Sequence, residues 1–272
     1  MDLRPVMGGI DRLAEAARPA AVGDWRNEQG LLMCGKCNAP LEYVIPKRAV
    51  KPFPEDTPPD KLKIMREVRD SIIGTKHRVM CKCAEAERTA YKRAEAAKAL
   101  ESRRGDCFGN HQILTKTTFS TDDGRSPELT ATLRRYVSKF GEMRALGHGL
   151  ILSGERDSGK SFNTLCIVNG VLTLGYRACY TSVYKIHTMT SPYISTQLVI
   201  NSMLDADLIA IDDVNEDCFE GKNYNTLVAL VNSAEARGIP LVIATRAVGA
   251  DTAQIKALCR RVSMIQIKKG AP

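Results

Sequence analysis

A short run of residues between Gly154 and Ser161 has the spacing G-x-x-x-x-G-K-[ST], which binds phosphate chains. In such a loop, backbone N–H groups and the start of the next helix face the negative charge. A lysine reaches the β and γ phosphates, and a hydroxyl holds Mg²⁺. We therefore predict a nucleotide site for ATP, with Ser161 as a Mg²⁺ ligand. The predicted nucleotide-binding residues are Gly154, Glu155, Arg156, Asp157, Ser158, Gly159, Lys160, Ser161 and Phe162.

Two adjacent carboxylates, Asp212 and Asp213, close the apolar run Leu208–Ile211. A carboxylate at the carboxyl end of a strand next to a P-loop can reach the Mg²⁺, and a second one can orient the attacking water. We assign Asp212 to the nucleotide-bound metal and Asp213 to water activation. The alternative is a pair that caps a helix after a buried strand.

Two cysteine pairs could bind a metal in the N-terminal part. Cys34-x-x-Cys37 is a common half-site for tetrahedral zinc, whereas Cys81-x-Cys83 has only one intervening residue, a spacing less usual for zinc. His77 lies near enough in sequence to replace one ligand. We predict a structural Zn²⁺ on Cys34, Cys37, Cys81 and Cys83. The other cysteines are predicted to be small buried hydrophobes, namely Cys107, Cys166, Cys179, Cys218 and Cys259.

Composition sets the broad class of the chain. Its 272 residues, 44% hydrophobic and 26% charged, are typical of a globular protein. No apolar run approaches the ~18 residues of a membrane helix, and acidic residues lie where a signal peptide would be basic and then apolar. We expect a cytoplasmic protein with reduced cysteines.

The basic charge is uneven along the chain. Residues 1–105 carry 21 basic and 15 acidic residues, a balance of +6, and residues 106–272 carry 18 and 16, a balance of +2. This bias favours a polyanion or an acidic protein surface as partner; a solvated charged face is the alternative.

Hydrophobic patterns place these residues on elements. Prolines between Pro46 and Pro59 exclude a continuous helix there. Strong helix formers at 84–104 predict a charged helix, and Ser126-Pro127 predicts a helix start followed by apolar spacing to Met143. Beyond Gly105, apolar runs alternate with helical patterns, which predicts a parallel sheet covered on both faces. The expected strands are 149–153, 178–181, 208–211, 241–245 and 264–267, and the expected helices between them are 162–174, 193–204 and 223–237.

The order of strand, P-loop, Asp-Asp strand, the strand Leu241–Thr245 and a late arginine resembles the AAA+ ATPases of the DnaC/DnaI helicase-loader and IstB-like group. Thr117-Thr118-Phe119 and Arg135-Tyr136-Val137 resemble the phage-borne members. The two cysteine pairs are similar to the zinc module of such loaders.

The resemblance implies a domain organisation and further site residues. It implies an α/β fold with a lidless P-loop AAA+ domain at 106–272, preceded by a zinc-binding helicase-interaction domain at 1–83 and a linking helix at 84–105. Thr245 or Arg246 would contact the γ-phosphate region, and Arg261 would be an arginine finger for a neighbouring subunit. Arg260 is the alternative finger, or both arginines form a solvated helix end. Asp157 and Arg246 depart from the family, which usually has glycine and asparagine there.

The resemblance also implies a function. Proteins of this group use ATP to place a DnaB-type replicative helicase on single-stranded DNA, here during phage DNA replication. We expect phosphate contacts to the DNA, self-association through the ATPase domain and no membrane partner. Two alternatives stay open: an IstB-like transposition helper that coats duplex DNA, and a non-hydrolysing adaptor with a bound nucleotide.

Overall fold

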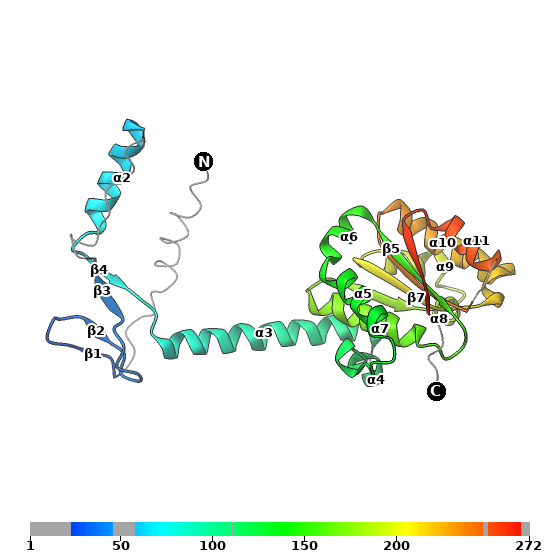
Figure 1. The fold of residues 1–272 in the computed structure, drawn as a ribbon, viewed down its shortest axis with the longest axis horizontal. Coiled ribbons are helices and arrows are strands. Elements are labelled where there is room, and N and C mark those ends of the chain that lie inside the picture. Colours follow the sequence, from blue (N-terminus) through cyan, green and yellow to red (C-terminus); the bar gives the residue numbers. More distant parts are fainter. Residues whose placement is uncertain (1–22, 46–57, 110, 247–249, 268–272) are drawn as a thin grey trace. The chain divides into compact units, whose positions relative to one another are not determined.

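The computed structural model describes residues 23–45, 58–109, 111–246 and 250–267, without the side chains of residues 72 and 250–252 (Figure 1). The chain forms two compact units, Met1–Glu95 and Ala96–Pro272. The first prolines of the predicted proline-rich stretch lie outside the described residues.

Small antiparallel pairings build the N-terminal unit. Its elements are β1 (Trp25–Arg26) paired with β2 (Leu32–Met33), β3 (Glu42–Val44) paired with β4 (Lys76–Arg78), and the helix α2 (Pro59–Ile72). Helix α2 was not predicted, yet it is compatible with the prolines, because Pro59 takes the first helical position, where no N–H is needed. In the described part of this unit, the buried apolar residues are Leu32, Cys34, Leu41 and Cys81.

A single helix, α3 (Lys82–Phe108), contains the boundary between the two units. It begins before the predicted helix and continues past Gly105, where the prediction ended it. Cys107 and Phe108 explain the extension, since both are buried in the core of the C-terminal unit and this packing outweighs the low helix propensity of glycine.

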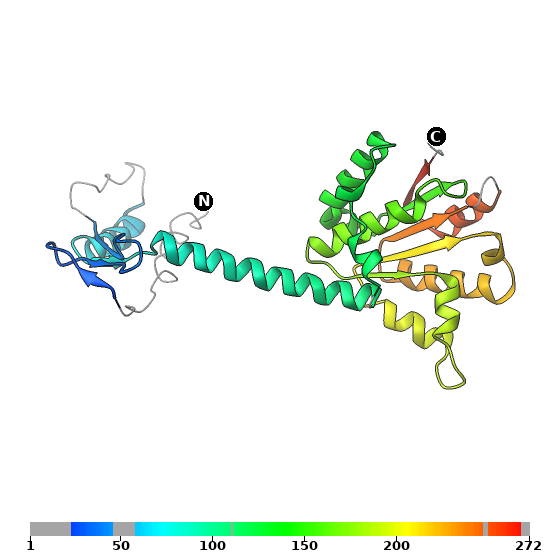
Figure 2. The same ribbon diagram turned by 90° about the horizontal axis from the view of Figure 1, so that it is seen from below.

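A five-stranded parallel sheet forms the centre of the C-terminal unit, in the order β6-β7-β8-β5-β9 (Figures 1 and 2). The strands are β5 (Gly149–Gly154), β6 (Ala178–Thr181), β7 (Leu208–Val214), β8 (Leu241–Thr245) and β9 (Val262–Ile267). All five correspond to predicted strands, and the predicted fold class, a parallel sheet flanked by helices, is confirmed.

Each face of the sheet has its own apolar core, and Figure 2 shows helices on both faces. Residues of one strand alternate between the two cores: Ile151 belongs to one and Leu152 to the other. One face packs against the end of α3 and the helices α5 (Pro127–Ser138), α6 (Phe140–Leu146) and α7 (Lys160–Thr173). The other packs against α8 (Val183–Thr188), α9 (Thr196–Met203), α10 (Gly221–Ala236) and α11 (Ala250–Leu258).

Several element limits differ from the prediction. The helix expected from Ser126 to Met143 is two helices, because Lys139 leaves helical geometry with φ −102° and ψ 17°. Ser126 precedes the helix, but its side chain makes no capping hydrogen bond. The helix expected from Tyr193 begins at Thr196, where the Ser195 hydroxyl accepts from the Leu198 N–H.

Short helical segments complete the unit: α4 (Gln112–Lys116), η2 (Phe119–Thr121) and η3 (Glu216–Phe219). In the described part of the chain, every helix is too short or too polar to cross a bilayer.

Candidate nucleotide site and cysteine cluster

The P-loop joins the carboxyl end of β5 to the start of α7, as predicted. Gly159 precedes α7 with φ 90°, a conformation that favours glycine. Asp157, which stands where the resemblance leads us to expect glycine, has φ 62° and is a rare non-glycine residue in the left-handed region. The backbone of the loop thus takes the left-handed turn despite the side chain, and the carboxylate of Asp157 points out into solvent.

Lys160 is folded back onto this loop. The residue is only 8% exposed, and its Nζ donates to the Glu155 carbonyl and, at 3.4 Å, to the Ser158 hydroxyl. Burial and, next, the positive charge of Arg246 lower the pKa of Lys160 below its ordinary value. A buried ammonium held only by neutral acceptors is well suited to exchange them for an anion.

Ser161 and Asp212, the two predicted Mg²⁺ ligands, meet beside the P-loop. Ser161 Oγ donates to Asp212 Oδ1 at 3.1 Å, and Asp212 is buried. A hydroxyl next to a carboxylate is the kind of oxygen pair that Mg²⁺ binds, with water completing its shell. The two residues therefore fit the ion that the motif implies.

Tyr180 was missed by the sequence analysis. It lies on β6, and its hydroxyl donates to the second oxygen of Asp212. Burial and the charge of Asp212 raise the pKa of Tyr180. No motif marks this tyrosine; only the pairing of β6 with β7 brings it to the aspartate.

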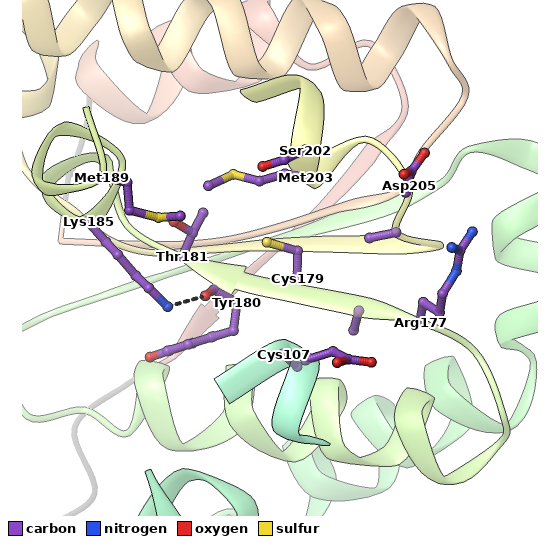
Figure 3. Close-up of a pocket in the computed structure, with 13 residues that line it drawn as sticks. Cys107, Arg177, Cys179, Tyr180, Thr181, Lys185, Met189, Ser202, Met203 and Asp205 are labelled. Atoms are coloured by element: carbon purple, nitrogen blue, oxygen red, sulfur yellow. Dashed lines mark hydrogen bonds between the residues drawn. The ribbon is translucent and has the colours of Figure 1, made fainter. Parts of the chain in front are cut away.

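A cavity of about 340 Å³ lies along β6, which is the edge strand of the sheet (Figure 3). Figure 3 shows Lys185 reaching from α8 to the backbone of Tyr180, where Nζ donates to the carbonyl at 3.4 Å. The ring of Tyr180 and the thiol of Cys179 point to opposite sides of the strand. Tyr180 is therefore held both at its backbone and at its hydroxyl.

Asp213 turns away from Asp212. The pairing of β7 with β8 shifts register between Ile211 and Val214, and Asp213 has φ 54° within this bulge. Its side chain is 64% exposed and forms an ion pair with Arg246, in which Nη2 and Oδ1 are 3.1 Å apart. The bulge thus separates the two adjacent carboxylates, and their roles in metal binding and water activation stay predictions.

Thr245 is the last residue of strand β8, and Arg246 follows it. Thr245 is fully buried, and its hydroxyl donates to the Val214 carbonyl at 2.7 Å. This bond anchors β8 to the bulge of β7. The predicted contact of Thr245 with the γ-phosphate region stays a prediction.

A larger cavity, of about 620 Å³, opens beside the two aspartates. Asp212, Asp213 and Tyr180 line one side of it, and the start of α4 lines another. It provides room next to the predicted metal position.

Arg261 lies at the opposite end of the sheet from the P-loop. It precedes β9, whose first residue pairs with Gly149, whereas the P-loop follows the last residue of β5. Six strand residues at ~3.3 Å each separate these ends by about 20 Å. Both Arg260 and Arg261 are exposed, and the Arg260 N–H donates to Glu235. Arg261 is thus placed outside the P-loop site of its own chain.

The four predicted zinc ligands come together. The Sγ atoms of Cys34, Cys37, Cys81 and Cys83 all lie within 4.8 Å of one another. A tetrahedral Zn²⁺ with bonds of about 2.3 Å needs sulfurs about 3.8 Å apart, so this cluster fits the ion. His77 is not part of it, and its ring contacts Tyr43 instead.

Local structure explains how distant cysteines meet. The β3–β4 pairing sets Glu42 opposite Arg78, so the residues before β3 and after β4 lie side by side. Cys34 begins a tight turn in which its N–H donates to the Ala39 carbonyl at 2.9 Å. Gly35 is required there, because an added Cβ would lie 2.0 Å from the Gly23 carbonyl oxygen. The unusual spacing of Cys81 and Cys83 is accommodated because α3 begins between them.

Charge in the cluster also favours a cation. The backbone N–H groups of Cys37 and Lys36 lower the pKa of Cys34 to about 6. Hydrogen bonds with the Cys81 and Cys34 thiols raise the pKa of Cys83 to about 12. An ionised Cys34 therefore opposes ionisation of Cys83, and the positive charge of a bound metal would offset the repulsion between the two thiolates.

The remaining cysteines are largely buried, as predicted. Cys107, Cys166, Cys218 and Cys259 are buried and Cys179 is half-buried, and all five pack in or against the cores of the C-terminal unit or lie within its helices. Burial raises the pKa of Cys166 and Cys259 to about 12. They are therefore small apolar groups rather than reactive thiols.

Among known proteins, this chain is similar to several solved structures. No family model matches the chain, and no curated protein matches its sequence. Among solved structures, the DnaC helicase loader is similar at 15% identity and a TM-score of 0.44, over 56% of this chain and 97% of DnaC. The structure of DnaI is similar at 13% identity and a TM-score of 0.47, over 60% of this chain and 95% of DnaI. AMPPCP-bound DnaA from Aquifex aeolicus is similar at 15% identity and a TM-score of 0.42, over 56% of this chain and 50% of the DnaA chain.

Proposed function

We propose that this chain is an ATPase that binds a DnaB-type replicative helicase and helps to place it on single-stranded DNA during phage DNA replication. The observation that carries the nucleotide part is the meeting of Lys160, Ser161 and Asp212 at a P-loop on the carboxyl edge of a parallel sheet. The loader part rests on the resemblance of the sequence motifs to DnaC/DnaI-type proteins.

The residues divide the work of ATP hydrolysis. The N–H groups at the start of α7 and the Lys160 ammonium bind the phosphates, and Ser161 and Asp212 would hold Mg²⁺. When bound, this ion neutralises charge on the phosphate oxygens. Asp213, directed away from Asp212 by the bulge of β7, orients the attacking water.

Arg261 is proposed to complete the site of a neighbouring subunit. It lies at the amino end of β9, whereas its own P-loop follows the carboxyl end of β5. A guanidinium so placed can reach a γ-phosphate only in another copy of the chain, where it would stabilise the transferring charge. Hydrolysis would then depend on self-association.

The N-terminal unit is proposed to bind the helicase. The zinc cluster would add to the small apolar core that the described part of this unit has, since metal-binding free energy also stabilises the fold. The basic excess of residues 1–105 supports an acidic protein surface or DNA as its partner.

Steady-state ATP hydrolysis of the full chain tests this proposal, with and without a DnaB-type helicase and single-stranded DNA. We expect slow basal hydrolysis that both partners increase, and loading of the helicase onto a closed single-stranded circle. Lys160→Ala should abolish both. Long filaments on duplex DNA would instead support the transposition helper, and tight ATP binding without turnover under any of these conditions would support the adaptor.

A further inference from the structure

Tyr180 approaches Asp212 from the edge strand of the sheet. It pairs in register with Ala210 of β7, and Asp212 lies two residues further along that strand. Alternate residues of a strand share a face, which brings the tyrosine ring and the aspartate together. The tyrosine hydroxyl donates to Asp212 Oδ2, and the Ser161 hydroxyl donates to Oδ1 at 3.1 Å. The two carboxylate oxygens therefore differ: Oδ1 contacts the P-loop serine, whereas Oδ2 accepts from the tyrosine.

Three contacts hold Tyr180 in this position. Its ring packs edge-on against Phe108 with the ring centroids 5.9 Å apart, Lys185 donates to its carbonyl at 3.4 Å, and its hydroxyl donates to Asp212. Figure 3 shows the ring on the side of β6 opposite the thiol of Cys179. A donor fixed in this way orients the carboxylate that accepts from it, as hydrogen bonds to metal ligands commonly do.

The number of available carboxylate oxygens bears on which divalent ion the site takes. Ca²⁺ takes about six to eight oxygen ligands, often with both oxygens of one carboxylate, whereas Mg²⁺ takes a near-ideal octahedron and keeps several waters. The Tyr180 hydroxyl competes with a metal ion for Asp212 Oδ2, because its proton brings positive charge to the same oxygen. It thereby disfavours coordination through both oxygens.

The space beside Asp212 does not itself distinguish the two ions. The cavity of about 620 Å³ there would hold the water shell of either, since one water takes about 30 Å³. The neighbouring carboxylate of Asp213 is paired with Arg246. In the described part of the site, the hydrogen bond from Tyr180 is therefore the feature that separates a one-oxygen from a two-oxygen ligand.

We propose that Tyr180 is a positioning residue that makes the nucleotide site selective for Mg²⁺ over Ca²⁺, because its hydroxyl keeps Asp212 a one-oxygen ligand. This inference rests on the proposed function, since it assumes that the site takes ATP with a metal ion. Without the hydroxyl, the Asp212 carboxylate can turn and offer both oxygens. Mg²⁺ then loses an oriented ligand, and Ca²⁺ gains an oxygen.

Calorimetry on the full chain tests this selectivity, with a non-hydrolysable ATP analogue bound in saturating Mg²⁺ or in saturating Ca²⁺. In Tyr180→Phe, which keeps the ring against Phe108, the affinity in Mg²⁺ should fall by about tenfold, as when a metal ligand loses its hydrogen-bond partner. The affinity in Ca²⁺ should rise, or fall by less than about twofold. The ratio of the two affinities is the measured quantity, because a general loss of structure weakens binding in both ions alike.

Tyr136→Phe is the matched control. Tyr136 belongs to the apolar core against which Tyr180 packs, and its hydroxyl donates to the His148 carbonyl at 2.8 Å. His148 immediately precedes β5, at the end of that strand opposite the P-loop. This variant also removes one tyrosine hydroxyl, yet it should leave the ratio unchanged. Chemical denaturation of both variants checks that each is folded.

The outcomes separate the inference from the proposed function. If the wild-type chain binds the analogue and Tyr180→Phe weakens binding equally in both ions, or in neither, only the inference is overturned. The same holds if Tyr136→Phe lowers the ratio as much as Tyr180→Phe does. If the wild-type chain binds the analogue in neither ion, the proposed function falls together with the inference.

Discussion

Lys160 and Asp213 separate nucleotide binding from hydrolysis in the proposed site. Lys160→Ala should reduce ATP affinity beyond detection, because the phosphates lose their buried positive partner. Asp213→Asn should still bind ATP and hydrolyse it at least about 10²-fold more slowly, as expected when a positioned base is lost. Equilibrium binding with a fluorescent ATP analogue and single-turnover hydrolysis measure the two effects separately. Normal turnover by Asp213→Asn would contradict the role given to it.

Asp157 adds both a negative charge and an unusual backbone conformation to the P-loop. Asp157→Gly should raise ATP affinity several-fold at low salt, because one carboxylate beside the phosphates is removed, and the gain should shrink as salt screens it. The free energy of unfolding should change by less than about 1 kcal/mol, since relief at φ 62° is offset by the greater freedom of unfolded glycine.

Asp157→Asn separates these two causes. It removes the charge but keeps a side chain that tolerates left-handed backbone. It should match the affinity gain of Asp157→Gly. A gain seen only with glycine would assign the effect to the backbone.

Sequence spacing predicted the phosphate-binding loop, the aspartate pair and the cysteine ligands, because each is a local pattern whose chemistry needs those residue types. It could not predict Tyr180 on Asp212 or Arg246 on Asp213. Both contacts join different strands, and they depend on the order of the strands and on the bulge of β7. Neither the strand order nor the bulge produces a residue spacing that can be recognised in the sequence.

At the scale of elements, the cysteine cluster ties the start of α3 to the turn after β2. We predict about one zinc per chain in protein prepared without chelator. Removal of the metal should unfold the N-terminal unit and leave nucleotide binding unchanged, because the two units have separate cores. Trp25, the single tryptophan of the chain, lies in the N-terminal unit and reports its unfolding by fluorescence.

Two variants sharpen this prediction. Cys34→Ser should lower the zinc content and shift the Trp25 emission as chelation does. Cys179→Ser, which changes a half-buried cysteine outside the cluster, should leave both unchanged. Full zinc content in Cys34→Ser would remove Cys34 from the ligand set.

Helices were harder to predict than strands, for a physical reason. The buried strands of the parallel sheet are continuous apolar runs, such as Leu241–Thr245, and each was found at its expected place, although β7 continues three residues further and β9 begins two residues earlier. Helix limits depend on tertiary contacts that propensity does not contain. Gly105 did not end α3 because Phe108 is buried beyond it, and Lys139 divides a helix that apolar spacing alone would continue.

At the scale of the whole molecule, the end of α3 belongs to the C-terminal unit. Arg103 Nε donates to the Leu172 carbonyl at 3.1 Å and Arg104 Nε to Asn169 at 3.1 Å. A fragment of residues 96–272 should therefore be more stable than one of residues 106–272 by about 1–3 kcal/mol, the value of two such bonds with their packing. Chemical denaturation of the two fragments measures the difference. Equal midpoints would show that the last turns of α3 are dispensable.

A substitution of Arg261 tests whether ATP hydrolysis depends on assembly of several copies of the chain. Arg261→Ala should retain ATP affinity but lose at least about 10³-fold of the hydrolysis that appears on assembly, as expected for a lost arginine finger. Arg260→Ala is the control, since the hydrogen bond of Arg260 to Glu235 comes from its backbone N–H, which the substitution keeps. An equal loss in both variants would leave the finger unassigned.

The position of Arg261 at the amino end of β9, about 20 Å from its own P-loop by strand length, has a consequence for stoichiometry. With Arg261 as the proposed finger and the P-loop at opposite ends of each sheet, contacts between copies would be head-to-tail rather than self-complementary. In an open row of subunits, one P-loop would always have no finger and one finger would have no P-loop. In a closed ring, every P-loop would have a finger. Hydrolysis per subunit should therefore rise with the length of the row, and the terminal subunit should hold its triphosphate the longest.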